Sequence, residues 1–116
     1  MSKTVTLYHN PRCSKSRAAL ALLEERGVTP QIIEYLKTPP TAGELKSLLK
    51  KIGIRAEQLV RTGEPVCKEK FGGRTLDEAQ WIEALAAHPI LIERPIVVSG
   101  ARAVIGRPPE KVLDLL

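Results

Sequence analysis

The chain has 116 residues, of which 43% are hydrophobic, 27% charged and 3% aromatic, and its formal net charge is +5 at pH 7. This length predicts one domain, and the hydrophobic content suffices for a core without disulfide or metal cross-links. The few aromatic residues and the lack of a long Lys/Arg block argue against nucleic-acid binding, so the positive charge fits small anions better.

The N-terminal sequence begins with a strand pattern and has neither a signal-peptide core nor an apolar run long enough to span a bilayer. We therefore expect a cytoplasmic protein with no membrane partner. Cys13 and Cys67 are far apart in the sequence and do not form a disulfide framework. The spacing of cysteine and histidine predicts no metal site.

The first part of the chain reads as strand, helix and strand. Residues 4–8 form an extended apolar run, residues 14–26 are helical with apolar residues over most of the circumference, and Gly27 is a stop signal. Residues 31–36 predict a second strand. Two strands joined by one helix form a right-handed parallel unit.

A helical region follows. Thr41 and Glu44 form a predicted capping box, and Gly53 ends that helix. Its apolar stripe consists of Leu45, Leu48, Leu49 and Ile52. Shorter helical pieces are expected over residues 57–60 and 64–71.

A longer helix is predicted over residues 75–87. Thr75 and Glu78 are expected to form its capping box. Its inward face should consist of Leu76, Ala79, Ile82 and Leu85.

The last third returns to strands. Residues 95–98 and 103–105 predict a hairpin around a turn at residues 99–102. Pro108 is expected at the first position of a C-terminal helix, where its missing N–H costs nothing. Val112, Leu113 and Leu116 should seal the sheet.

Cys13 lies where the first strand gives way to the first helix. Pro11 biases Asn10 away from helical angles, and a helix-forming segment begins directly after Cys13. The free N–H groups and the positive dipole end of a helix favour thiolate over thiol. Cationic charge nearby comes from Arg12, Lys15 and Arg17. A lone cysteine is often only a small buried hydrophobe, but this setting favours a nucleophile.

The same helix N-terminus is a potential anion site. A thiolate beside such a site suits either attack on a disulfide or displacement at an oxyanion centre such as arsenate.

Four motifs in this order resemble the glutaredoxin-coupled arsenate reductase family, in the ArsC/Spx-like branch of the thioredoxin-like superfamily. They are residues 8–17, 35–40, 93–98 and 106–110, and the resemblance extends from end to end of the chain. It implies an α/β fold with a thioredoxin-like mixed four-stranded sheet flanked by helices. It also implies one domain over residues 1–116, with a helical insertion between the second and third strands at about residues 38–89.

The resemblance also implies a reaction. Cys13 would attack arsenate to form a cysteine thioarsenate adduct, which glutathione takes on to arsenite before glutaredoxin closes the cycle. Arg61, Arg94 and Arg107 would surround the oxyanion. A planar guanidinium donates parallel hydrogen bonds to an oxyanion and keeps its charge, so the chemistry agrees. No cofactor is expected to be bound, and glutathione is a co-substrate.

Five further residues are expected to support the site: His9, Asn10, Ser16, Arg17 and Pro95. His9 either tunes the thiol or makes a structural hydrogen bond. The resemblance to thioredoxin-like proteins predicts a cis peptide bond between Arg94 and Pro95, although most X-Pro bonds are trans.

Ser16 occupies the position of a resolving cysteine in a C-x-x-C pair. Cys13 therefore cannot form a local disulfide and needs an external thiol. The Ser16 hydroxyl can still donate a hydrogen bond to the thiolate or to a bound anion. Cys67 is not part of the family's pattern and is either an alternative resolving thiol or a peripheral one.

Three other functions fit parts of this pattern. A glutathione-dependent thiol or mixed-disulfide reductase would use the same nucleophile. An Spx-like regulator that binds RNA polymerase usually carries a C-x-x-C switch, against which Ser16 argues. A plain anion-binding module would bind arsenate or sulfate without any dependence on the thiol.

Overall fold

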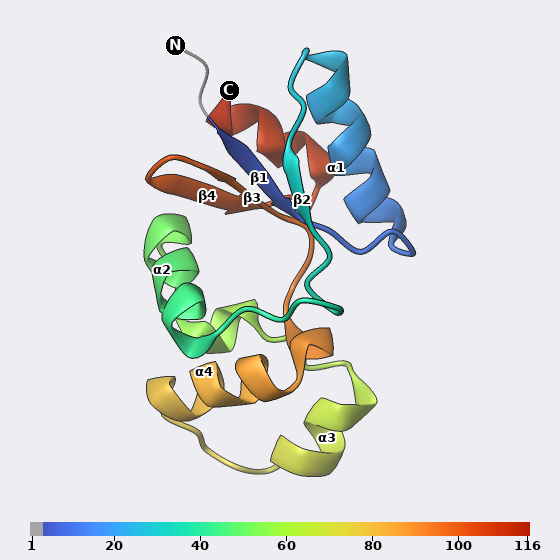
Figure 1. Cartoon of the computed structure of the whole chain (residues 1–116). Helices are drawn as coiled ribbons and strands as arrows, with labels where there is room; N and C mark the ends of the chain where they lie inside the picture. Colours follow the sequence, from blue (N-terminus) through green and yellow to red (C-terminus); the bar gives the residue numbers. More distant parts are fainter. Residues whose placement is uncertain (1–3) are drawn as a thin grey trace. The chain divides into compact units, whose positions relative to one another are not determined.

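The computed structural model describes residues 4–116, and these residues include a mixed four-stranded sheet (Figure 1). The strands are β1 (Val5–Tyr8), β2 (Gln31–Ile33), β3 (Ile96–Ser99) and β4 (Arg102–Ile105), in the order β2-β1-β3-β4. β1 pairs with β2 in parallel and with β3 antiparallel, and β3 and β4 form the predicted hairpin. The predicted mixed sheet is confirmed.

The chain divides into two compact units. The sheet unit consists of the described residues up to Thr38 together with Arg94–Leu116, and the helical unit is Pro39–Glu93. The helical unit is inserted between β2 and β3, as the sequence predicts.

One face of the sheet packs against α1 (Ser14–Glu25) and a C-terminal 3₁₀ helix, η3 (Pro109–Leu115), which lie beside each other in Figure 1. Leu7 pairs with Val97, so these side chains share a face of the sheet, and Val5 joins them because alternate residues of a strand point the same way. The core of the unit is formed by Val5, Leu7, Ala19, Leu23, Val97, Val112 and Leu115.

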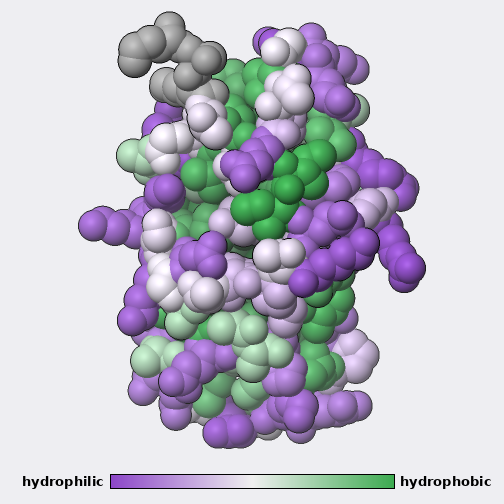
Figure 2. Space-filling model, in the orientation of Figure 1, coloured by the Kyte–Doolittle hydropathy of each residue, from purple (hydrophilic) through white to green (hydrophobic). Residues whose placement is uncertain are grey.

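β2 ends earlier than the sequence predicts. The N–H groups of Lys37 and Thr38 both donate to the Glu34 carbonyl at 2.9 Å, so residues 34–37 form a turn and not the end of a strand. Hydrophobic side chains are exposed here, with Ile32 46% and Leu36 41% accessible. Figure 2 shows hydrophobic residues at the surface in the region where Figure 1 places β2.

The C-terminal segment differs from its prediction in two ways. It is a 3₁₀ helix whose first residue is Pro109, and Pro108 occupies the cap position. Leu115 is buried on the core, whereas Leu116 is 52% exposed. The shift follows from the tighter turn of a 3₁₀ helix, in which residues three apart lie above one another, as do Val112 and Leu115.

The helical unit contains α2 (Ala42–Ile52), η1 (Ala56–Leu59), α3 (Pro65–Phe71), α4 (Glu78–Ala87) and η2 (Pro89–Leu91). The predicted capping box of α2 is confirmed, because the Thr41 side chain accepts from the Glu44 N–H and the Glu44 carboxylate accepts from the Thr41 N–H. Gly53 ends α2 with φ +84°, a left-handed conformation that favours glycine. Among residues 4–116, no helix is long and apolar enough to cross a membrane.

The start of α4 was predicted wrongly. Asp77 is the cap, accepting from the Gln80 N–H at 2.8 Å, while the Gln80 side chain accepts from the Asp77 N–H at 2.9 Å. The Glu78 carboxylate instead accepts from the Ala56 N–H at 3.0 Å, which ties α4 to η1. Ala79 is exposed, so the predicted inward face is also wrong in part. The buried residues of α4 are Trp81, Ile82, Ala84 and Leu85.

This difference can be tested with a matched pair of variants. Asp77→Ala removes the side chain that satisfies the Gln80 N–H, and should lower the free energy of unfolding by about 1 kcal/mol. Thr75→Ala removes the cap predicted from the sequence and should change it by less than about 0.5 kcal/mol. Urea denaturation followed by circular dichroism measures both, and equal losses would contradict the assignment of Asp77.

Candidate active site

Cys13 is held at the junction between β1 and α1. Its N–H donates to the Asn10 carbonyl at 2.9 Å, and its carbonyl accepts from the Arg17 N–H at 3.0 Å, so the residue is fixed by a turn on one side and by the helix on the other. It is the cap residue of α1 with extended backbone angles (φ −94°, ψ 122°). The residue is 9% exposed, which leaves a small part of it accessible.

The pKa of the Cys13 thiol lies below its ordinary value. Burial raises this pKa, but it is outweighed by the Ser16 N–H, the Arg94 guanidinium and the Lys15 N–H, which stabilise the thiolate. Two of these donors are the free amides of the first turn of α1, as the sequence predicts. The cationic side chain that stabilises the thiolate is Arg94, which is distant in sequence and follows the helical unit.

A buried network joins the loop before Cys13 to α1. His9 Nδ1 and Ser16 Oγ lie 2.6 Å apart and share a hydrogen bond, and Ser16 Oγ also accepts from the Asn10 N–H at 3.0 Å. All three residues are buried. The pKa of His9 is lowered, mainly by burial. The Glu34 carboxylate raises this pKa, and the Arg17 guanidinium lowers it further. His9 thus makes a structural hydrogen bond with Ser16, and its other predicted role, tuning of the thiol, stays a prediction.

The Ser16 side chain is part of this network, and its predicted hydrogen bond to the thiolate or to a bound anion stays a prediction. Its hydroxyl is bonded to His9 and Asn10. The group of Ser16 that lowers the pKa of the Cys13 thiol is its backbone N–H.

Asn10 and Arg17 close the same loop from its two ends. Asn10 Oδ1 accepts from the Arg12 N–H at 3.0 Å, which forms a local turn typical of asparagine. Arg17 Nη1 donates to the Pro11 carbonyl at 3.0 Å. Both residues therefore fix the backbone that carries Cys13.

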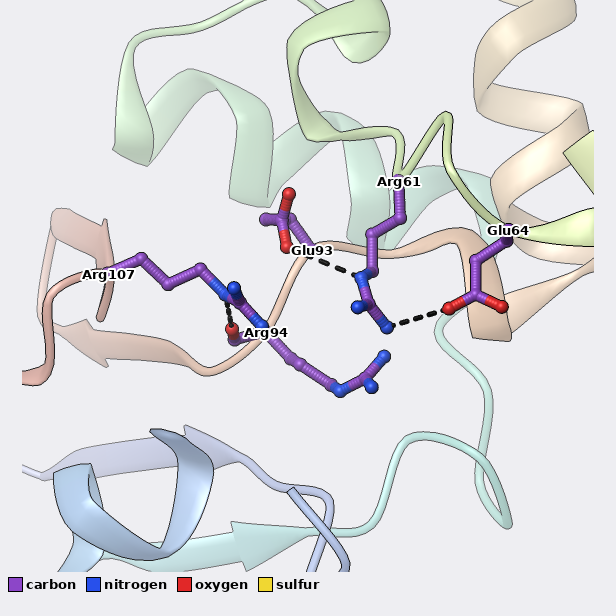
Figure 3. A network of polar contacts seen from close by, with 5 residues as sticks. All are labelled: Arg61, Glu64, Glu93, Arg94 and Arg107. Atoms are coloured by element: carbon purple, nitrogen blue, oxygen red, sulfur yellow. Dashed lines mark hydrogen bonds and ion pairs between the residues drawn. The ribbon is translucent and has the colours of Figure 1, made fainter. Parts of the chain in front are cut away.

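Arg94 and Arg107 meet at the start of β3. Arg107 Nε donates to the Arg94 carbonyl at 2.7 Å (Figure 3). The predicted cis bond between Arg94 and Pro95 is confirmed, and a second one, between Arg107 and Pro108, was not predicted. Nε and Nη1 of Arg94 are buried and have no hydrogen-bond partner among residues 4–116. The guanidinium beside Cys13 thus has unpaired donors.

Arg61 belongs to the helical unit and is held by acidic side chains. Its Nη1 is 2.9 Å from Glu64 Oε1, and its Nε is 3.5 Å from Glu93 Oε1 (Figure 3). Its N–H donates to the Leu91 carbonyl at 2.7 Å. The structure thus orients Arg61 within its own unit, and its role at an oxyanion stays a prediction.

Tyr35 was missed as a site residue. It is 1% exposed, and its hydroxyl has no hydrogen-bond partner among residues 4–116. The pKa of this hydroxyl is raised, mainly by burial. Smaller effects come from Arg94 and Asn10, which lower it, and from Cys13, which raises it, so the Tyr35 hydroxyl lies near these site residues. The signal in the sequence was its place just after β2, because parallel strands end at the same edge of a sheet.

Both cysteines are free. Cys67 is buried in α3, and its N–H donates to the Glu64 carbonyl at 3.0 Å. In residues 4–116 no cluster of three or more His, Cys, Asp or Glu side chains could hold a metal ion.

Residues 8–115 match the model of the ArsC family. The chain belongs to the ArsC family. The match spans Cys13 and the three predicted arginines, and with the mixed sheet and its helical insertion it confirms the resemblance and the thioredoxin-like fold.

Known proteins similar to this chain match nearly its full length. It is 48% identical to the uncharacterized protein YfgD of Escherichia coli K12, over 100% of this chain and 99% of that protein. It is 46% identical to an arsenate reductase of Haemophilus influenzae, over 97% and 99%. The solved structure of an arsenate reductase from Vibrio cholerae matches with a TM-score of 0.95 and 47% identity, covering 100% of both chains.

The lowered thiol pKa predicts early ionisation of Cys13. In a Cys67→Ser background, the rate of alkylation by iodoacetamide should rise with pH around a midpoint below that of an unperturbed cysteine thiol. Arg94→Gln should move the midpoint to higher pH, because a group that stabilises the thiolate is lost. Arg12→Gln removes an exposed cation from the same loop and is the control. An equal shift in both variants would contradict the assignment to Arg94.

The buried network predicts a stability difference between two serines of α1. Ser16→Ala leaves the Asn10 N–H and the His9 ring nitrogen without a partner, and should lower the free energy of unfolding by about 1–3 kcal/mol. Ser14→Ala changes an exposed residue of the same turn and should cost less than about 0.5 kcal/mol. Urea denaturation measures both, and similar values would argue against the network.

Proposed function

We propose that this protein reduces arsenate to arsenite with glutathione and glutaredoxin, through a cysteine thioarsenate intermediate on Cys13. One observation carries the proposal: the thiolate-favouring Cys13 lies beside an Arg94 guanidinium with two buried, unpaired donors. A buried guanidinium with free N–H groups is suited to a bidentate oxyanion. Relatives named arsenate reductases support the same substrate.

The first step is a displacement at arsenic. The Cys13 thiolate forms the S–As bond, and one As–O bond breaks as its oxygen takes up a proton and leaves as water. The N–H groups of Lys15 and Ser16, which stabilise the thiolate in the free protein, remain at the helix N-terminus to stabilise the negative charge of the bound group.

The second step transfers two electrons to arsenic. A glutathione thiolate attacks the Cys13 sulfur, a new S–S bond forms, and the electrons of the S–As bond leave with arsenic, so that As(V) becomes As(III) and arsenite departs. Glutaredoxin then attacks the mixed disulfide and releases the Cys13 thiolate. An external thiol is required because Ser16 stands where a resolving cysteine would be.

Arginines supply the charge selection in this scheme. Arg94 faces the thiolate, and Arg107 anchors the Arg94 carbonyl through its Nε. Arg61, braced by Glu64 and Glu93, is proposed as a third oxyanion ligand. Carboxylates that hold a guanidinium in one orientation reduce the conformational entropy that its side chain would lose on binding an anion.

A coupled assay tests the proposal. NADPH oxidation is followed with arsenate, glutathione, glutaredoxin and glutathione reductase for the wild type, Cys13→Ser and Cys67→Ser. Turnover should require arsenate, fall to background in Cys13→Ser because no nucleophile remains, and persist within about twofold in Cys67→Ser.

Two outcomes would contradict this proposal. Equal rates with and without arsenate, together with reduction of a glutathione mixed disulfide, would favour the thiol reductase. Loss of turnover in Cys67→Ser, with a folded variant, would give the chain an internal resolving thiol and remove the need for external glutathione at that step.

A further inference from the structure

The Tyr35 hydroxyl is a buried polar group that the proposed reaction does not yet use. The residue is 1% exposed, and its oxygen has no hydrogen-bond partner among the described residues. Nε and Nη1 of Arg94 are also buried and have no hydrogen-bond partner among the described residues. Buried polar groups are nearly always paired, so buried donors without a partner call for an acceptor.

Topology brings Tyr35 to the edge of the sheet that carries the thiol. β1 and β2 are parallel, and the His9 N–H donates to the Ile33 carbonyl at 2.8 Å, which continues their pairing past the end of β1. Tyr35 follows β2 by two residues, as the Cys13 loop follows β1. The mutual electrostatic effects of Tyr35, Arg94 and Cys13 agree with this placement.

We propose that the Tyr35 hydroxyl is an oxyanion-binding group of the Cys13 site and donates a hydrogen bond to the tetrahedral anion held by Arg94. This inference rests on the proposed function, since it takes the same oxyanion as ligand. It adds the hydroxyl of Tyr35 to a site for which the sequence predicted three arginines, the N–H groups of the helix N-terminus and the Ser16 hydroxyl around the anion.

The chemistry of Arg94 and Tyr35 suits a ligand rich in acceptors. A guanidinium has donors alone, and a tyrosine hydroxyl has one donor besides its acceptor oxygen. Burial raises the pKa of Tyr35, so its hydroxyl stays protonated at neutral pH and can donate. A tetrahedral oxyanion has several oxygens pointing in different directions, so it can accept from Tyr35 and from both Arg94 nitrogens at once.

The test uses Tyr35→Phe, which keeps the ring and removes the oxygen. In the Cys67→Ser background, Cys13 is alkylated with iodoacetamide at increasing arsenate concentrations without glutathione. Arsenate should protect the thiol, and the concentration for half protection should rise about tenfold in Tyr35→Phe, as expected for loss of one hydrogen bond to a charged group.

Two readouts separate this role from a structural one. The alkylation rate without arsenate should stay unchanged in Tyr35→Phe, and in the coupled assay KM for arsenate should rise while KM for glutathione does not. Lys37→Ala removes an exposed cation two residues away and serves as the matched control, with protection as in the wild type.

The possible outcomes distinguish the two proposals. The role of Tyr35 would be overturned if the arsenate concentration for half protection were the same in Tyr35→Phe and in the wild type. It would also be overturned if the alkylation rate without arsenate changed by the same factor as that concentration. Arsenate protection of the wild type without arsenate-dependent NADPH oxidation would overturn the proposed function, while the comparison with Tyr35→Phe would still decide the role of Tyr35. No protection of the wild type by arsenate would overturn both.

Discussion

The site depends on keeping the N-terminus of α1 fixed on the Cys13 sulfur. A buried thiol resists ionisation, and here the amides of Lys15 and Ser16 and the Arg94 guanidinium have to outweigh that effect. Amides can do so only if the loop before the helix cannot move. The buried bonds of His9 and Asn10 to Ser16 hold that loop, so much of the local sequence serves to position one atom.

The Arg94 guanidinium has buried N–H groups without hydrogen-bond partners, and packing elsewhere in the protein has to offset their cost. Each unpaired buried donor costs about 1–3 kcal/mol, and more when it is charged. The cost is offset by packing elsewhere in the sheet unit, where Leu7, Leu23 and Val97 are fully buried between the sheet and α1. The bond from Arg107 to the Arg94 carbonyl holds the backbone of Arg94. In the proposed function, the oxyanion would supply the acceptors that the guanidinium lacks.

Local rules predicted those parts of the fold that depend on local chemistry. The start of α1, the Thr41 cap and the hairpin follow from neighbouring residues, and the cis bond before Pro95 followed from the family resemblance. The cap of α4 could not be predicted from neighbouring residues, because Thr75 with Glu78 and Asp77 with Gln80 both fit the capping-box pattern. A tertiary contact decides between them, since the Glu78 carboxylate accepts from the Ala56 N–H and is not available to Thr75. Tyr35 was missed for a related reason, because only pairing of β2 with β1 brings it to the site.

Ser16 links the stability of the loop to the kind of redox chemistry the site can perform. Its hydroxyl accepts from the Asn10 N–H and bonds to His9, which a thiol would do more weakly because sulfur is a poor hydrogen-bond partner. A cysteine at this position would supply a resolving thiol but loosen the loop that holds Cys13. With serine the loop is firmly fixed and the oxidised sulfur has no partner three residues away. In the proposed function, the dependence on an external thiol would thus come from the same side chain that helps to position the nucleophile.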